Sequence, residues 1–153
     1  TVTALTQLYA EKGGESEAPY FKEAINYVSG SEQYSFIQNY SKFLKKCTDK
    51  TIQESMPTLE YMGRNGTQWY VRLSAVQAMG DLSDKYSKDI KELKDKMAEN
   101  KTAKKEGENP KLEIQISEIN RLKQPIDDRI AAIKSDEQDP NLKQIYGTAT
   151  SEK

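Results

Sequence analysis

The sequence contains no histidine and a single cysteine among its 153 residues. Without histidine there is no imidazole base, no Ser-His or Cys-His nucleophile pair and no histidine ligand for zinc. Cys47 has no second cysteine for a disulfide or a metal site, and its neighbours Phe43 and Leu44 predict a small buried hydrophobe in a helix. We therefore expect no catalytic, cofactor-binding or metal-ligating residue, and no enzyme activity from this chain by itself.

The sequence also lacks an excess of charge and a long apolar run. It has 23 Lys and Arg against 24 Asp and Glu, whereas nucleic-acid-binding proteins usually carry a basic excess, so we expect no nucleic-acid partner. No apolar run approaches the about 18 residues of a membrane span, and the N-terminus has no signal-peptide pattern. Because the chain begins with Thr1 rather than Met, we expect it to be a piece of a longer protein, with a processed chain as the alternative.

Apolar residues recur at helical spacing, while prolines and glycines fall mostly between the periodic stretches, which predicts an all-α fold. Ser31 is the expected N-cap of the third helix, and Thr48 or Asp49 that of the fourth. Pro57 is expected to kink the fourth helix or to start another. The first five expected helices cover about 2–11, 19–28, 31–47, 49–62 and 68–83.

The composition changes after residue 84. Aromatic residues are concentrated at or before Tyr70, and we expect them to build the core. Two narrow apolar stripes, over 86–97 and 112–133, are joined by a polar segment and predict a charged antiparallel helical hairpin. Pro125 is expected to kink or break the longer arm near 121–124.

The expected organisation is a helical body over 1–84 and a hairpin over 85–146, within one structural domain. The hairpin unit ends in a short helix that packs back through its apolar side chains. The frayed terminus is expected over 147–153. The side chains expected to pack back are Leu142, Ile145 and Tyr146.

The most apolar stretch, 69–82, reads W-Y-V-R-L-S-A-V-Q-A-M-G-D-L and resembles the second helix of a HEAT-type repeat. The resemblance implies HEAT/ARM-like antiparallel helix pairs in a right-handed superhelical stack, followed by the hairpin. The turn before Val71 lacks the Asp that usually pairs with the Arg of a neighbouring repeat. We therefore expect Arg72 to form a structural salt bridge or to be an exposed charge, with a partner contact as the alternative.

The W-Y-V-R helix, the hairpin and a terminal I-x-x-x-E-x-D-P-x-L-x-x-I-Y run at 133–146 together resemble the C-terminal helical domain of bacterial aminopeptidase N-like zinc metallopeptidases. The resemblance covers about 20–146. It implies zinc and an H-E-x-x-H motif in a catalytic domain outside this chain, whose peptide-access side this domain would shape or cover. It also favours the bacterial periplasm or cell envelope over the cytoplasm. The candidate contacts to the catalytic domain or to peptide substrate are Arg64, Arg72, Trp69 and Tyr70.

The alternative is a free-standing helical-repeat adaptor that binds a protein or peptide partner through its aromatic concave face or the hairpin. Tyrosines of the first three helices would then line a groove, although such residues are more often core. Paired carboxylates are interpreted as solvated helix faces and caps rather than metal or acid/base pairs, because adjacent helical positions point in different directions. The pairs are Asp127 with Asp128, Glu137 with Asp139, and Asp81 with Asp84.

Overall fold

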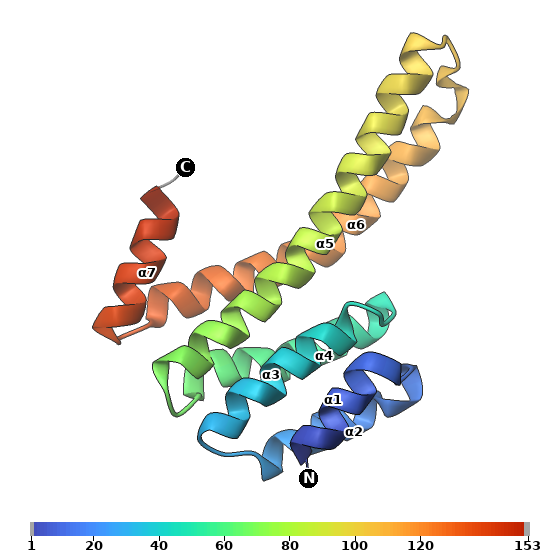
Figure 1. Ribbon diagram of the computed structural model, residues 1–153. Coiled ribbons are helices and arrows are strands. Elements are labelled where there is room, and N and C mark those ends of the chain that lie inside the picture. The colour runs from blue at the N-terminus through green and yellow to red at the C-terminus, as the bar shows by residue number, and fades with distance from the viewer. Residues whose placement is uncertain (1, 152–153) are drawn as a thin grey trace.

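The computed structural model describes the backbone of residues 2–151 and side chains as far as residue 147. This part of the chain is helical and contains no strand, which confirms the all-α prediction. In Figure 1, the upper half of α5 and the first half of α6 project together from the body as an antiparallel pair, and α7 turns back at the far end of α6. The helices are α1 (Val2–Lys12), α2 (Ala18–Ala24), α3 (Ser31–Leu44), α4 (Asp49–Asn65), α5 (Trp69–Thr102), α6 (Asn109–Asp136) and α7 (Pro140–Ser151).

Local backbone chemistry explains where these helices begin and end. Thr48 is the N-cap of α4, and its side-chain oxygen accepts a hydrogen bond from the Thr51 amide at 3.5 Å. The predicted cap at Ser31 is wrong, because Gly30 is the N-cap of α3 and has the positive φ of 56° that glycine tolerates. The expected helix over 19–28 is also shorter, since α2 gives way to a 3₁₀ turn at Ile25–Tyr27.

Two prolines lie inside continuous helices. Pro57 does not break α4, and Pro125 does not break α6, so of the kink or break expected near 121–124 the break is excluded and the kink remains. Pro125 has no backbone N–H, so the carbonyl of Arg121 loses its helical donor. The Gln53 amide of α4 donates a 3.2 Å hydrogen bond to the next carbonyl, that of Leu122, and links the two helices at this point. Figure 1 shows that α6 changes direction along its length.

The predicted fifth helix and the first arm of the hairpin are one helix, α5, so the expected end at residue 83 is wrong. Leu82, Tyr86 and Ile90 follow one another at spacings of four residues and are all buried. No glycine or proline interrupts the helix between them. The proposed boundary between 84 and 85 therefore falls inside a continuous helix. The composition changes there because α5 leaves the body and continues as one arm of the projecting pair with α6.

Phenylalanine rings form the centre of the body. Phe21 stacks on Tyr40 with ring centroids 5.0 Å apart and on Phe43 at 4.5 Å. All three rings are buried, which agrees with the predicted aromatic core. The prediction fails for several tyrosines, whose hydroxyl-bearing rings lie at the surface. The exposed ones are Tyr27, Tyr34 and Tyr61.

The end of the chain packs back as expected, with one exception. Leu142 and Tyr146 of α7 are buried, whereas Ile145 is 39% exposed. The expected frayed terminus over 147–153 is helical as far as Ser151, and its last two residues lie outside the described part of the chain.

Cys47 is buried, as predicted, although it lies in the turn after α3 rather than in a helix. Its thiol donates to the carbonyl oxygen of Phe43 at 3.3 Å. Burial, together with the negative charge of Glu15, raises the pKa of the Cys47 thiol to about 11. The thiol is therefore protonated at neutral pH and is a poor nucleophile.

We predict that Cys47 of the folded protein reacts with a disulfide reagent much more slowly than an unfolded cysteine at pH 8, because both burial and the raised pKa lower the reactive thiolate population. The measurement is the rate of thionitrobenzoate release in buffer and in 8 M urea. Equal rates in the two solvents would contradict a buried, protonated thiol.

Gly66 allows the chain to turn tightly between α4 and α5. A Cβ atom at this position would lie 2.8 Å from both the carbonyl oxygen of Met62 and a methyl carbon of Val71. We predict that Gly66→Ala lowers the free energy of unfolding by about 1–3 kcal/mol, the usual cost of overpacking. Urea denaturation measures this, and Gly107→Ala is the matched control because a Cβ there meets open space. An equal effect of the two substitutions would contradict the close packing at Gly66.

Candidate functional site

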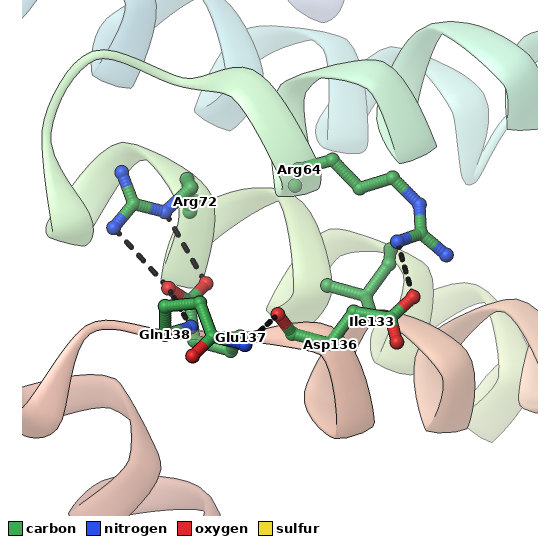
Figure 2. Close-up of a pocket in the computed structure, with 7 residues that line it drawn as sticks. Arg64, Arg72, Ile133, Asp136, Glu137 and Gln138 are labelled. Atoms are coloured by element: carbon green, nitrogen blue, oxygen red, sulfur yellow. Dashed lines mark hydrogen bonds and ion pairs between the residues drawn. The ribbon is translucent and has the colours of Figure 1, made fainter.

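A cluster of arginines and carboxylates joins α4 and α5 to the corner between α6 and α7 (Figure 2). Arg72, near the start of α5, donates from Nε to Glu137 Oε2 at 3.2 Å and from Nη2 to Glu137 Oε1 at 3.4 Å. Its Nη1 donates to the carbonyl of Gly66 at 2.8 Å. The side chains of Arg72 and Glu137 are only 16% and 7% exposed. The expected structural role of Arg72 is thus observed, as a largely buried two-point ion pair.

Glu137 and Asp139 also organise the start of α7. Glu137 Oε1 accepts the backbone amides of Gln138 at 3.1 Å and Asp139 at 3.0 Å. Asp139 Oδ1 accepts the amide of Asn141 at 2.8 Å, which confirms the expected capping role for Asp139. The solvated position expected for Glu137 is wrong, because its carboxylate lies under Arg72 and within the corner. We name this arrangement of Arg72, Glu137 and Asp139 the arginine clamp.

The other sequence-predicted arginine lies beside the clamp. Arg64 of α4 donates from Nη1 to Asp136 at 2.8 Å and from Nε to Glu60 at 3.3 Å. Glu60 also pairs with Arg129 of α6. These groups are more exposed than the clamp, so each pair contributes little to stability by itself. Together they form a second polar link between α4 and α6.

The two links border a hollow of about 190 Å³, lined by Gly63, Ile133 and the corner residues 136–138. Figure 2 shows both arginines directed toward the carboxylates of the corner. The polar side chains therefore neutralise one another within the chain. Nor does the described part of the chain hold a group of three or more residues suited to a metal ion. The charged residues of this site therefore hold α4 and α5 against the corner between α6 and α7.

Trp69 and Tyr70 lie in the first turn of α5, just before Arg72; the Trp69 side chain is partly exposed, and Tyr70 is partly buried against the core. Trp69 is 38% exposed, and its ring centroid is 6.0 Å from that of Tyr70 in an edge-to-face arrangement. The Tyr70 ring meets that of Tyr34 in the same way at 6.0 Å. A hollow of about 530 Å³ lies beside Tyr34 and Tyr70. We call Trp69, Tyr70 and Tyr34 the aromatic end, a type of surface that is enriched in protein interfaces.

The structure thus brings the four predicted site residues to one end of the body, with two distinct roles. The arginines are engaged internally, and the aromatic rings are partly free to meet another molecule. Sequence reasoning missed Glu137 and Tyr34 as members of these groups. An arginine in a mostly apolar helix, such as Arg72, needs an anionic partner when it is buried. The E-x-D run of Glu137 and Asp139 could have been proposed as that partner.

No protein-family model, curated protein or solved structure matches this chain. The aminopeptidase resemblance therefore rests on the motif residues alone. In the described residues, no helix combines the length and apolar character needed to cross a membrane.

We predict that Arg72→Met lowers the free energy of unfolding by about 3 kcal/mol, because it leaves the buried carboxylate of Glu137 without its cation. The double variant Arg72→Met/Glu137→Leu should recover part of that loss, since it removes the unpaired charge as well. Urea denaturation of the two single variants and the double variant gives the coupling energy.

Lys91→Met is the control for this cycle, because it removes an exposed pair with Asp95. Its effect should stay within about 0.5 kcal/mol. Additive effects of the Arg72 and Glu137 substitutions would show that the two residues are not coupled and would contradict the clamp.

Proposed function

We propose that the chain is a non-catalytic helical domain of an aminopeptidase N-like zinc metallopeptidase, where it shapes or covers the side from which peptides reach a catalytic domain. The observation that carries this proposal is the contact between Arg72 and Glu137, 65 positions apart in the chain. It joins the W-Y-V-R and E-x-D-P runs on which the resemblance rests. That contact supports treating the two runs as one packing unit rather than as two separate chance matches.

A HEAT-like stack is part of the same proposal. Consecutive helices α4 and α5 pack against each other in opposite directions, as helices do within repeats, and α3 packs on α5 (Figure 1). Gly63 of α4 supports close stacking, because a Cβ there would lie 3.1 Å from a methyl carbon of Ile133 in α6. The long pair formed by α5 and α6 would be the charged hairpin that follows the repeat body.

The aromatic end is the proposed contact to the catalytic domain. Trp and Tyr give large apolar areas with polar tips and are the residues most often dominant in binding energy. Arg72 of the arginine clamp lies in the same first turn of α5 as Trp69 and Tyr70, so the clamp would hold this contact surface in place. The zinc and the reaction itself would belong to the catalytic domain.

The second candidate is a free-standing adaptor that binds a protein or peptide. A hollow of about 500 Å³ favours it, with Ile25, Pro57 and Tyr61 among its lining residues. Tyr61 is 60% exposed. Aromatic side chains beside a shallow hollow suit an extended peptide segment.

The test of the leading proposal combines the gene with an assay. We predict that the coding sequence upstream of Thr1 contains H-E-x-x-H and that the intact protein hydrolyses an aminoacyl anilide in a zinc-dependent manner. The isolated chain with added Zn²⁺ should show no turnover, because it has no histidine.

An upstream sequence without H-E-x-x-H would contradict the aminopeptidase proposal and favour the adaptor. Zinc-dependent turnover by the isolated chain would overturn both proposals. Substituting the first histidine of the upstream motif is the control that assigns the activity of the intact protein to the catalytic domain.

A further inference from the structure

Asn65 and Gly66 form the one Asn-Gly pair of the sequence, and they lie where α4 gives way to the turn before α5. Asn65 is exposed to water. An asparagine followed by glycine is the pair most prone to deamidation, because glycine has no Cβ and leaves its backbone nitrogen open to approach. The other asparagines are followed by proline or by a residue with a larger side chain: Tyr27, Tyr40, Lys101, Pro110, Arg121 and Leu142.

Deamidation of this pair needs only water. The Gly66 nitrogen loses its proton and attacks the side-chain carbonyl carbon of Asn65, and the new N–C bond closes a five-membered succinimide. The side-chain nitrogen takes up the proton and leaves as ammonia. Water then adds to one of the two succinimide carbonyls and breaks its C–N bond, which gives aspartate or isoaspartate. The net change is amide and water to carboxylic acid and ammonia, without oxidation or reduction.

The folded turn holds both reacting groups back. The Gly66 N–H donates to the carbonyl of Met62 at 2.9 Å, and this hydrogen bond retains the proton that the reaction must remove. The side-chain amide of Asn65 donates to the carbonyl of Tyr61 at 3.2 Å, which directs it back along α4. The last turn of α4 therefore has to open before the nitrogen can reach the side-chain carbon.

Arg72 closes the same turn from the α5 side. Its Nη1 donates to the carbonyl of Gly66 at 2.8 Å, while its Nε is bound to Glu137. The hydroxyl of Thr67 donates to Gln33 Oε1 at 3.0 Å and holds the following residue. Loss of Arg72 would remove one of the bonds that oppose opening, so the arginine clamp and the reactivity of the Asn-Gly pair are physically connected.

We infer that Asn65 is a deamidation site protected by the arginine clamp, and that its modification loosens the turn between α4 and α5. A carboxylate at this position has no N–H for the carbonyl of Tyr61. It also adds negative charge at the C-terminal end of α4, where the helix dipole disfavours it. Isoaspartate lengthens the main chain by one carbon and shifts Gly66 away from Met62 and Arg72. The inference does not depend on the aminopeptidase proposal, because it involves only this chain and water.

The first test compares the folded chain with the chain in guanidinium chloride at pH 8 and 37 °C. Peptide mapping by mass spectrometry follows the conversion of amide to acid at each asparagine. Asn65 should react at least about tenfold more slowly in the folded chain, because reaction requires local opening. Asn141, which precedes Leu142, is the internal reference and should stay far less modified than Asn65 in the denaturant.

Equal rates at Asn65 in the two solvents, or no faster reaction than at Asn141 in the denaturant, would overturn the inference. Gly66→Ala identifies the attacking nitrogen. In guanidinium chloride it should slow the reaction at Asn65 several-fold, because the added Cβ crowds that nitrogen. An unchanged rate would contradict the succinimide route.

Arg72→Met tests the protection by the clamp. It should accelerate deamidation of the folded chain about two- to tenfold, the factor that corresponds to the loss of one hydrogen bond. The rate in guanidinium chloride should not change. Arg72→Lys is the second variant in case the first does not fold, since lysine keeps the positive charge but cannot bind Glu137 and the Gly66 carbonyl together. Ile90→Ala, at a buried position farther along α5, is the control and should leave the folded-state rate unchanged.

Equal acceleration by the Arg72 variant and by Ile90→Ala would show that deamidation follows global unfolding and would contradict a role for the clamp. No acceleration by either Arg72 variant would contradict it as well.

Asn65→Asp tests the consequence of the modification, because it introduces the charge of the product. Its unfolding equilibrium constant should be about two- to fivefold larger, the factor expected for an unfavourable charge at a helix end. Asn120→Asp, at an exposed position inside α6, is the matched control and should have little effect. Urea denaturation measures both variants. Equal stabilities of the two variants would overturn the proposed loosening of the turn.

Discussion

The burial of helix α5 on several sides is the constraint on which the rest of the structure depends. Its residues Val71, Ala75 and Leu82 are fully buried, and α3, α4 and α6 all pack along it. Small side chains such as Ala75 let neighbouring helix axes approach closely, and the longer apolar side chains fill the space between them. Because α5 continues as one arm of the projecting pair, the same helix sets the positions of the body and of that pair.

The arginine clamp connects α5 to α7, the last helix of the chain. Leu142 and Tyr146 give α7 its apolar attachment, while Arg72 supplies the polar tie through Glu137. Burial raises the pKa of the Tyr146 hydroxyl to about 12, so the ring stays neutral over the physiological range. A buried ion pair adds less net stability than its Coulomb energy suggests, but it strongly disfavours arrangements that leave one partner alone. The clamp therefore specifies where α7 turns back.

Much of the helical body could be predicted from the sequence, because apolar spacing depends only on neighbouring residues. The face with Phe36 and Tyr40 and the cap at Thr48 are of this kind. At Pro125 the sequence left a kink and a break both open, because the outcome depends on tertiary packing that no local pattern reveals. The change in composition at residue 84 was misleading, since α5 continues through it with different neighbours. Glu137 was missed for a similar reason: a pair separated by 65 positions has no sequence signal beyond the need of Arg72 for an anion.

Helix α5 thus combines a buried face, the arginine clamp near its start and the partly exposed ring of Trp69 at the aromatic end. The central claim is that the aromatic end meets the rest of a larger assembly. Amide hydrogen exchange tests it most directly, by comparing the isolated chain with the intact protein that contains it. The account predicts added protection in the intact protein at the start of α5 and in the part of α3 around Tyr34. Identical exchange in the two proteins, or added protection only in the projecting part of α5 and α6, would contradict it.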